Sequence, residues 1–150
     1  MSDIGIFINN SCFDLDILND DIRPDDGLET SIIISLFTDK RVDDDSLPIG
    51  ESSKRGWWGD ALALNDLDQI GSRLWTLDRS KINNETLRRS EELAKESLEW
   101  MIEDQIASEI KIISEYNDDK HLIMNISVSR PNRDDEKFSI LWNSQEIRRL

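Results

Sequence analysis

The chain has 150 residues, of which 33% are charged, and its formal net charge is −14. A field of this sign repels phosphate groups, so we expect no direct binding to nucleic acid or to an anionic membrane. Cys12 is the one cysteine, which excludes an intrachain disulfide. No apolar run reaches the roughly 18 residues of a membrane span, and a signal peptide is not expected either. The length suits a single domain covering residues 1–150.

The N-terminal third is expected to hold one strand and one helix. Residues 13–18 alternate apolar and acidic side chains, which is typical of a half-buried strand. Residues 25–41 begin with Asp25 and Asp26 as candidate caps, continue with an apolar stripe at helical spacing, and end in two basic residues. These features predict a helix, although the run SIIIS within them also suits a buried strand.

A long loop should follow over residues 42–72. This stretch is polar, contains proline and glycine, and predicts at most a short helical turn. Loops of this length are uncommon in compact domains and are usually functional or ordered by a partner. We therefore expect the loop to take part in binding.

The clearest expected element is a second helix over residues 83–104. Asn83 or Asn84 provides its cap, and an acidic residue follows in the first turn. One face of this helix should pack on the core. Its members are Leu87, Ala94, Leu98, Met101 and Ile102.

The remainder predicts a β-meander with strands at 106–116, 121–130 and 136–143. In the last two strands, alternate positions are apolar and should share one face. They are Leu122, Met124, Ile126 and Val128, followed by Phe138, Ile140 and Trp142. The sequence therefore predicts an α+β fold, in which a small antiparallel C-terminal meander packs with two main helices separated by the long loop.

Residue types that carry catalysis are sparse. His121 is the only histidine and begins an expected strand, while Cys12 has no histidine near it in sequence. No phosphate-binding loop, dinucleotide-binding motif or nucleophile elbow occurs. We expect no enzymatic activity, no metal and no cofactor.

The motif RGWWGD at 55–60 places two adjacent tryptophans between glycines. Glycines let a loop turn tightly and present both indoles outward. One ring could pin the loop onto the domain's own core, but adjacent side chains point apart, so we expect a partner surface here. Tryptophan and arginine dominate interface hot spots. The candidate interface residues in this region are Arg55, Gly56, Trp57, Trp58, Gly59, Arg73 and Trp75.

Four segments carry a resemblance to a known family. They are GLETSIIISLFTDKR (27–41), RGWWGD (55–60), GSRLWTLDRSK (71–81) and ETLRRSEELAKESLEWMIED (85–104). In this order they resemble the small baseplate protein of Mu-like bacteriophages, the family named after Mu gene product forty-six. The resemblance spans about residues 13–143, and its most specific part is the separation of RGWWGD from GSRLW.

That family is similar in turn to the wedge proteins of the T4 gene-twenty-five type, found in contractile tails and type VI secretion. The resemblance implies a structural subunit of the virion's tail baseplate, assembled in the bacterial cytoplasm. Implied partners are other wedge proteins, the tail sheath protein and the central spike or tube hub, with six copies per baseplate. Many of those relatives carry Glu-Pro-Arg after the second helix. This chain has Asp104, Gln105 and Ile106 there, so that tripeptide's role is not carried over.

The resemblance also implies that the C-terminal sheet accepts strands from the sheath and thereby initiates sheath assembly. A three-stranded meander leaves an edge with unpaired backbone groups, and we expect the strand at 136–143 to be that edge. Phe138, Ile140 and Trp142 join the candidate interface for this reason. The second face of the helix, with Leu93, Trp100, Ser90 and Ser97, is either offered to neighbouring wedge subunits or packed on the chain's own sheet.

Two other classes of function remain as alternatives. Some wedge relatives were labelled lysozyme-like, so a tail-associated peptidoglycan hydrolase with an acidic pair is the main one. An acidic decoy that mimics DNA is the other, although RGWWGD has no role in it.

Overall fold

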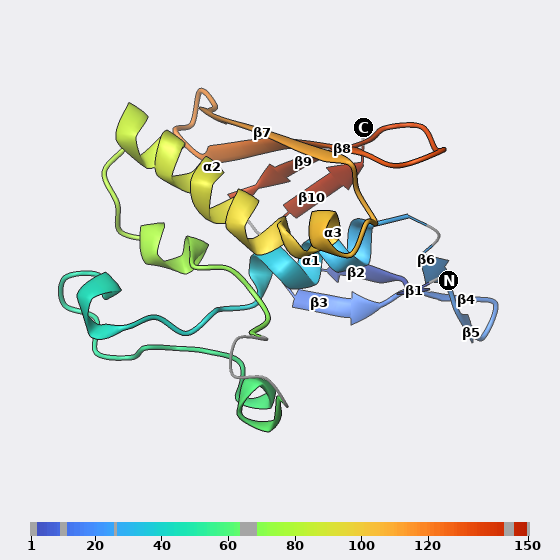
Figure 1. Ribbon diagram of the computed structural model, residues 1–150, viewed down its shortest axis with the longest axis horizontal. Coiled ribbons are helices and arrows are strands. Elements are labelled where there is room, and N and C mark those ends of the chain that lie inside the picture. The colour runs from blue at the N-terminus through green and yellow to red at the C-terminus, as the bar shows by residue number, and fades with distance from the viewer. Residues whose placement is uncertain (1–2, 10–11, 26, 64–68, 143–145, 150) are drawn as a thin grey trace.

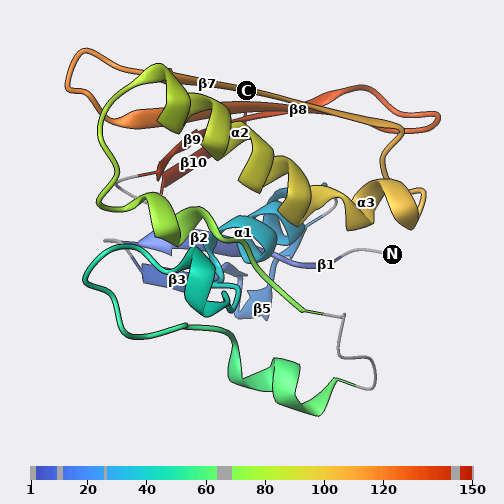
Figure 2. The ribbon, with the colours of Figure 1, turned by 60° about the vertical axis from the view of Figure 1, so that its left-hand side comes forward.

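The computed structural model describes residues 3–9, 12–25, 27–63, 69–142 and 146–149. Figures 1 and 2 show a C-terminal sheet, a layer of helices beneath it and small N-terminal strand pairs on the far side of the helices. The segment that follows the first helix extends away from these layers. The expected α+β class is confirmed. None of the helices in the described parts of the chain combines the length and the apolar character of a membrane span.

Helix α1 (Glu29–Phe37) confirms the first expected helix but is shorter than predicted. The Asp25 carboxylate holds the start of this helix. It accepts hydrogen bonds from the backbone amides of Gly27, just before the helix, and Thr30, in its first turn, at 2.9 Å each. Asp26 lies outside the described residues. The helix ends where Thr38 becomes extended, so the two basic residues at 40–41 lie beyond it and do not face its dipole.

Short strands precede α1, and they differ from the half-buried strand expected at 13–18. They are β1 (Asp3–Ile4), β2 (Ile6–Asn9), β3 (Cys12–Leu15), β4 (Ile17–Leu18), β5 (Asp21–Ile22) and β6 (Pro24–Asp25), paired as β1–β6, β2–β3 and β4–β5. The expected strand is broken at Asp16, whose amide donates to Gly5 while its carbonyl accepts from Arg23. Ile17 and Leu18 are exposed, so the expected burial is wrong here.

The second expected helix is present as α2 (Asn84–Leu98) followed by α3 (Trp100–Glu103). Asn83 is its cap and accepts the Thr86 amide at 2.8 Å. Ile102 is exposed, contrary to expectation. The supposed second face is buried in this chain at Leu93, Ser90 and Ser97. The reason is that α2 packs against both β7 and α1 and so buries two faces.

The C-terminal sheet contains the three expected strands and one more. Its order is β10 (Glu146–Arg149), β9 (Glu136–Leu141), β8 (Leu122–Ser129) and β7 (Glu109–Tyr116), all antiparallel. The expected edge at 136–143 is wrong, because Ile140 pairs with Met124 on one side and with Ile147 on the other. Residue 143 lies outside the described residues. The sequence of strand β10 has little apolar alternation, so its pattern did not predict a strand.

The margin of β7 is partly closed by helix α2. The Ser114 amide donates to the Glu91 carboxylate at 2.7 Å, and the Ser114 and Ser90 hydroxyls lie 2.8 Å apart. A carboxylate on this edge amide competes with an incoming strand. Within the described residues β10 pairs with β9 alone, so β10 is the more open margin.

One hydrophobic core connects the sheet and the helices. The buried cluster comprises Leu28, Ile32, Leu36, Leu74, Leu93, Ala94, Leu98, Met101, Ala107, Ile110, Leu122, Met124, Ile126, Val128, Phe138 and Ile140. The alternate residues of β8 all belong to it, as the sequence predicted.

Candidate partner interface

The long loop leaves and rejoins the body at one place. Residue Asp39 bridges Ser72 in parallel, the Lys40 amide donates to the Ser72 carbonyl at 2.9 Å, and the Ser72 hydroxyl donates to the Leu36 carbonyl at 2.6 Å. Gly71 makes this possible, because its φ is +104° and an added Cβ would lie 2.3 Å from the Thr38 carbonyl oxygen. The loop is therefore anchored at its base and free to project between the two ends.

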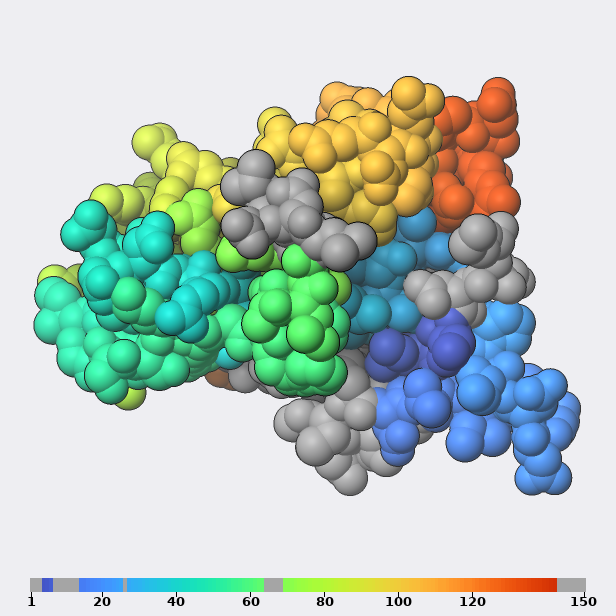
Figure 3. Space-filling model, turned by 60° about the horizontal axis from the view of Figure 1, so that its bottom comes forward, coloured from blue at the N-terminus to red at the C-terminus, as the bar shows by residue number. Residues whose placement is uncertain are grey.

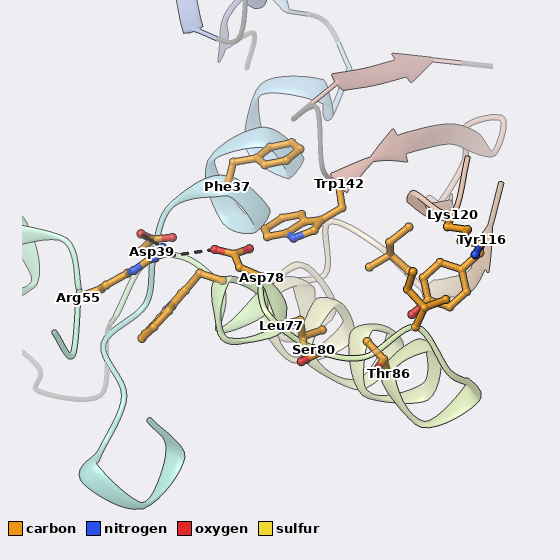
Figure 4. A pocket seen from close by; sticks show the side chains of 13 residues that line it. Phe37, Asp39, Arg55, Leu77, Asp78, Ser80, Thr86, Tyr116, Lys120 and Trp142 are labelled. Atoms are coloured by element: carbon orange, nitrogen blue, oxygen red, sulfur yellow. Dashed lines mark hydrogen bonds and ion pairs between the residues drawn. The ribbon is translucent and has the colours of Figure 1, made fainter. Parts of the chain in front are cut away.

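Arg55 fastens the outgoing half of the loop to this base. Its guanidinium lies 2.9 Å from Asp39, 3.7 Å from Asp78 and 4.4 Å from the centre of the Trp75 ring (Figure 4). The Trp75 indole N–H in turn donates to the Lys40 carbonyl at 2.9 Å. Arg55 thus has partners within its own chain.

Trp75 was expected to face a partner, and the structure contradicts this. Its side chain is only 3% exposed, because the ring fills the space beneath Arg55 at the base of the loop. Trp75 anchors the loop and does not present a surface.

The two adjacent tryptophans lie at the far end of the loop. Trp57 is 41% exposed, Trp58 is 74% exposed, and their ring centres are 5.5 Å apart. The short helix η2 (Trp58–Leu62) adds Leu62, which is 76% exposed. We call Trp57, Trp58 and Leu62 the tryptophan knob. Figure 2 shows η2 well away from the sheet and from α2, and in the space-filling view of Figure 3 this green segment lies at the surface beside the teal part of the loop.

The glycines of RGWWGD have separate roles. Gly56 has a φ of +110°, and an added Cβ would lie 2.9 Å from the Arg41 Cβ. Gly59 is buried under the Trp57 ring, where a Cβ would come within 2.2 Å of ring atoms. Gly59 therefore lets Trp57 fold over the η2 backbone, which leaves Trp58 as the more open ring.

An aromatic groove lies on the other side of Arg55. Phe37 and Trp142 stack with their centres 5.4 Å apart and their planes within 6°. With Asp78, Tyr116 and Lys120 they line a cavity of about 520 Å³ (Figure 4). Partial burial raises the pKa of Asp78 above its ordinary value of 3.8, while the charge of Arg55 and a hydrogen bond from Trp142 act in the opposite direction.

Replacing Arg55 should raise the pKa of Asp78 further. In Arg55→Gln the opposing positive charge is lost while the burial of the carboxyl remains. The stability that depends on Asp78 is greatest below pH 3.8 and falls as pH rises through its raised folded-state pKa, so this loss should occur at higher pH in the variant. A carbon-13 NMR titration of the carboxyl group measures the pKa. Arg23→Gln, which removes an arginine paired with Asp16, is the control and should leave the Asp78 titration unchanged.

The other expected interface residues are divided between surface and core. The Trp100 indole N–H donates to the Ser35 hydroxyl at 3.1 Å, and the ring is 37% exposed. Arg73 is ion-paired with Glu96. Phe138 and Ile140 were expected at an interface, but both are fully buried and belong to the hydrophobic core, so they serve the chain's own packing.

Three residues of this region were not predicted from the sequence. Asp39 and Asp78 are brought to Arg55 from separate segments, and nothing local marks them as its partners. Leu62 could have been noticed, because it follows RGWWGD within two residues. The chemistry gathered here is apolar and aromatic contact, which suits a protein partner. Among the described residues, no group of three or more histidine, cysteine or acidic side chains is placed to hold a metal ion.

Comparison with known proteins decides the family. The model of the family described as phage protein GP46 matches residues 28–135. The chain belongs to this family. "Baseplate protein gp46" of Escherichia phage Mu is 39% identical over 132 residues, covering 87% of this chain and 89% of that protein. "Mu-like prophage FluMu protein gp46" of Haemophilus influenzae is 36% identical over 145 residues, covering 95% and 99%. No solved structure matches significantly.

The GP46 family match includes every part of the candidate interface except Phe138, Ile140 and Trp142, which lie beyond residue 135. Residues 28–135 contain the loop base, Arg55, the tryptophan knob and Trp100. The likeness between this GP46 chain and its relatives therefore extends over the projecting loop as well as over the core.

Proposed function

We propose that this chain is a structural, non-enzymatic subunit of a phage tail baseplate, assembled in the bacterial cytoplasm and carried in the virion. The observation that supports this most strongly is near full-length similarity to a relative named baseplate protein. The structure agrees with a role in assembly, because its most exposed aromatic surface projects on an anchored loop.

The tryptophan knob is the part of the chain that we assign to a neighbouring protein. Burying one tryptophan side chain removes roughly 150–250 Å² from water. At about 25 cal/mol/Å² this is worth several kcal/mol, which the isolated chain does not gain from Trp58. Because Arg55 and Gly71 fix the loop at its base, the knob is presented without a large loss of freedom on binding.

We further propose the wedge position beside the tail tube, in six copies, with the sheath initiated by strand addition. Strand β10 is the margin that would receive a strand, in place of the 136–143 edge that β10 itself covers. The margin of β7 is less suited, because Glu91 already binds the Ser114 amide there.

The test is to delete the gene from a phage or prophage that carries it and to restore it with a tagged copy. We expect deletion to stop assembly before the sheath is laid, and mass spectrometry of purified tails to find the tagged chain. Complete contractile tails formed without the chain would contradict the proposal. The purified chain should release no muropeptides from peptidoglycan, and release that is lost on replacing one acid would favour the hydrolase.

A further inference from the structure

A second cavity, of about 580 Å³, lies between α1, α3 and the point where the loop returns at Gly71. We call it the α3 groove. Its walls differ in character from the aromatic groove around Asp78. The residues that matter here are Ile34, Ile70, Glu99, Trp100, Glu103 and Asp104.

The floor of the α3 groove is apolar and held in place. Ile34, Ile70 and Trp100 are each 37% exposed. The hydrogen bond from the Trp100 indole to Ser35, at 3.1 Å, fixes the orientation of the ring. A ring fixed in this way can accept a ligand without first losing rotamer freedom.

The wall of the groove beside α3 is acidic and open. Glu99 and Glu103 are one helical turn apart, and Asp104 follows at the end of α3. All three are exposed, and within the described residues none forms an ion pair. Glu96, one turn earlier, also lines the groove and pairs with Arg73. It lies 3.8 Å from Lys40, the basic residue of the groove's lining, so Lys40 already has an acidic partner.

We propose that the α3 groove binds an arginine or lysine side chain, next to an aliphatic one, on a neighbouring protein. An indole face attracts a cation and also packs against the aliphatic stem of a long basic side chain. The carboxylates of Glu99, Glu103 and Asp104 supply the complementary charge. Ile34 and Ile70 take the aliphatic neighbour. This assignment rests on the proposed baseplate role and adds the chemistry of one partner.

Charge argues for a basic partner in preference to a second copy of this chain. The chain carries a net charge of −14, so two copies repel each other. A basic segment of another protein gains from the same field, both in the rate of encounter and in the choice of partner. We therefore assign the groove to a different protein.

The first test uses a peptide probe on the isolated chain. N-acetyl-Leu-Arg-amide is added to nitrogen-15-labelled protein, and the Trp100 indole N–H is followed by NMR. We expect a saturating shift in the millimolar range. The binding affinity should fall about fivefold or more in two cases: when neutral citrulline replaces the arginine of the peptide, and when the protein is the variant E99Q/E103Q/D104N. D118N/D119N, in the turn after β7, is the control and should bind as wild type. An unmoved Trp100 signal, or equal binding by the neutral peptide, overturns the proposal.

The second test is made in assembled tails. E99K/E103K should be incorporated about tenfold less than wild type, because two repelling charges replace two attracting ones. D118K/D119K makes the same change in net charge outside the groove and should be incorporated normally. Equal incorporation of both variants overturns the inference alone. Absence of the wild-type chain from tails overturns the proposed function instead.

Discussion

Phe138→Ala should lower the free energy of unfolding of the isolated chain by about 3–5 kcal/mol, as removal of a fully buried aromatic ring does. Phe138 is fully buried, pairs with Ile126 on β8 and belongs to the single core that links the sheet to the helices. Its loss leaves a cavity that neighbouring strands cannot close. Urea unfolding followed by circular dichroism measures the change.

Lys137→Ala is the matched control, because Lys137 is the preceding residue on β9 and is exposed. Its effect should stay within about 0.5 kcal/mol. If Phe138→Ala proved as mild as the control, Phe138 would belong to an interface after all, as its sequence pattern first suggested. If the variant fails to fold, refolding in a stabilising osmolyte allows the comparison to be made.

Trp58→Ala should leave the stability of the free chain within about 0.5 kcal/mol of wild type, because the ring is largely exposed. The same change should reduce incorporation into tails about thirtyfold, which is the effect of losing a hot spot worth about 2 kcal/mol. Quantitative mass spectrometry of purified tails measures incorporation. The two readouts together separate an interface role from a folding role.

Ile49→Ala is the control for the Trp58 variant. Ile49 is fully exposed on the same loop but lies outside the tryptophan knob. It should affect neither stability nor incorporation. A Trp58→Ala chain that unfolds easily would place the ring in the core, and one that enters tails normally would remove the knob from the interface.

The elements that sequence predicted well are those whose signals are local. The Asn83 cap and the alternation of β8 depend only on neighbouring residues, and the structure confirms both. The first helix was predicted too long because its two basic residues suited a helix end. The parallel bridge between Asp39 and Ser72, which pulls the chain into extended form, is a contact across the long loop.

The candidate site was only partly predictable for the same reason. The motif RGWWGD drew attention to the two tryptophans that the structure leaves exposed. Nothing in the sequence distinguished the exposed Trp58 from the enclosed Trp75. The enclosure of Trp75 depends on Arg55, Asp39 and Asp78 meeting from three segments. Likewise, Phe138 and Ile140 looked like an edge only while β10 was unknown.

The sequence motifs indicate the family of this chain, whereas the structure explains how its long loop is held. The order of RGWWGD and GSRLW indicated the family, and the comparisons confirm it. Only the coordinates show that Gly71 and Arg55 turn the segment between these motifs into an anchored projection. The physical role of the loop therefore follows from contacts that neither motif contains.

A cryo-electron microscopy reconstruction of tails that contain this chain most directly tests whether the tryptophan knob binds a neighbouring protein. It should show the chain in the baseplate with Trp58 covered by a neighbouring subunit, while Trp75 and Phe138 stay enclosed within their own chain. A map in which Trp58 still faces solvent, or has folded back onto its own core, would contradict this role of the tryptophan knob.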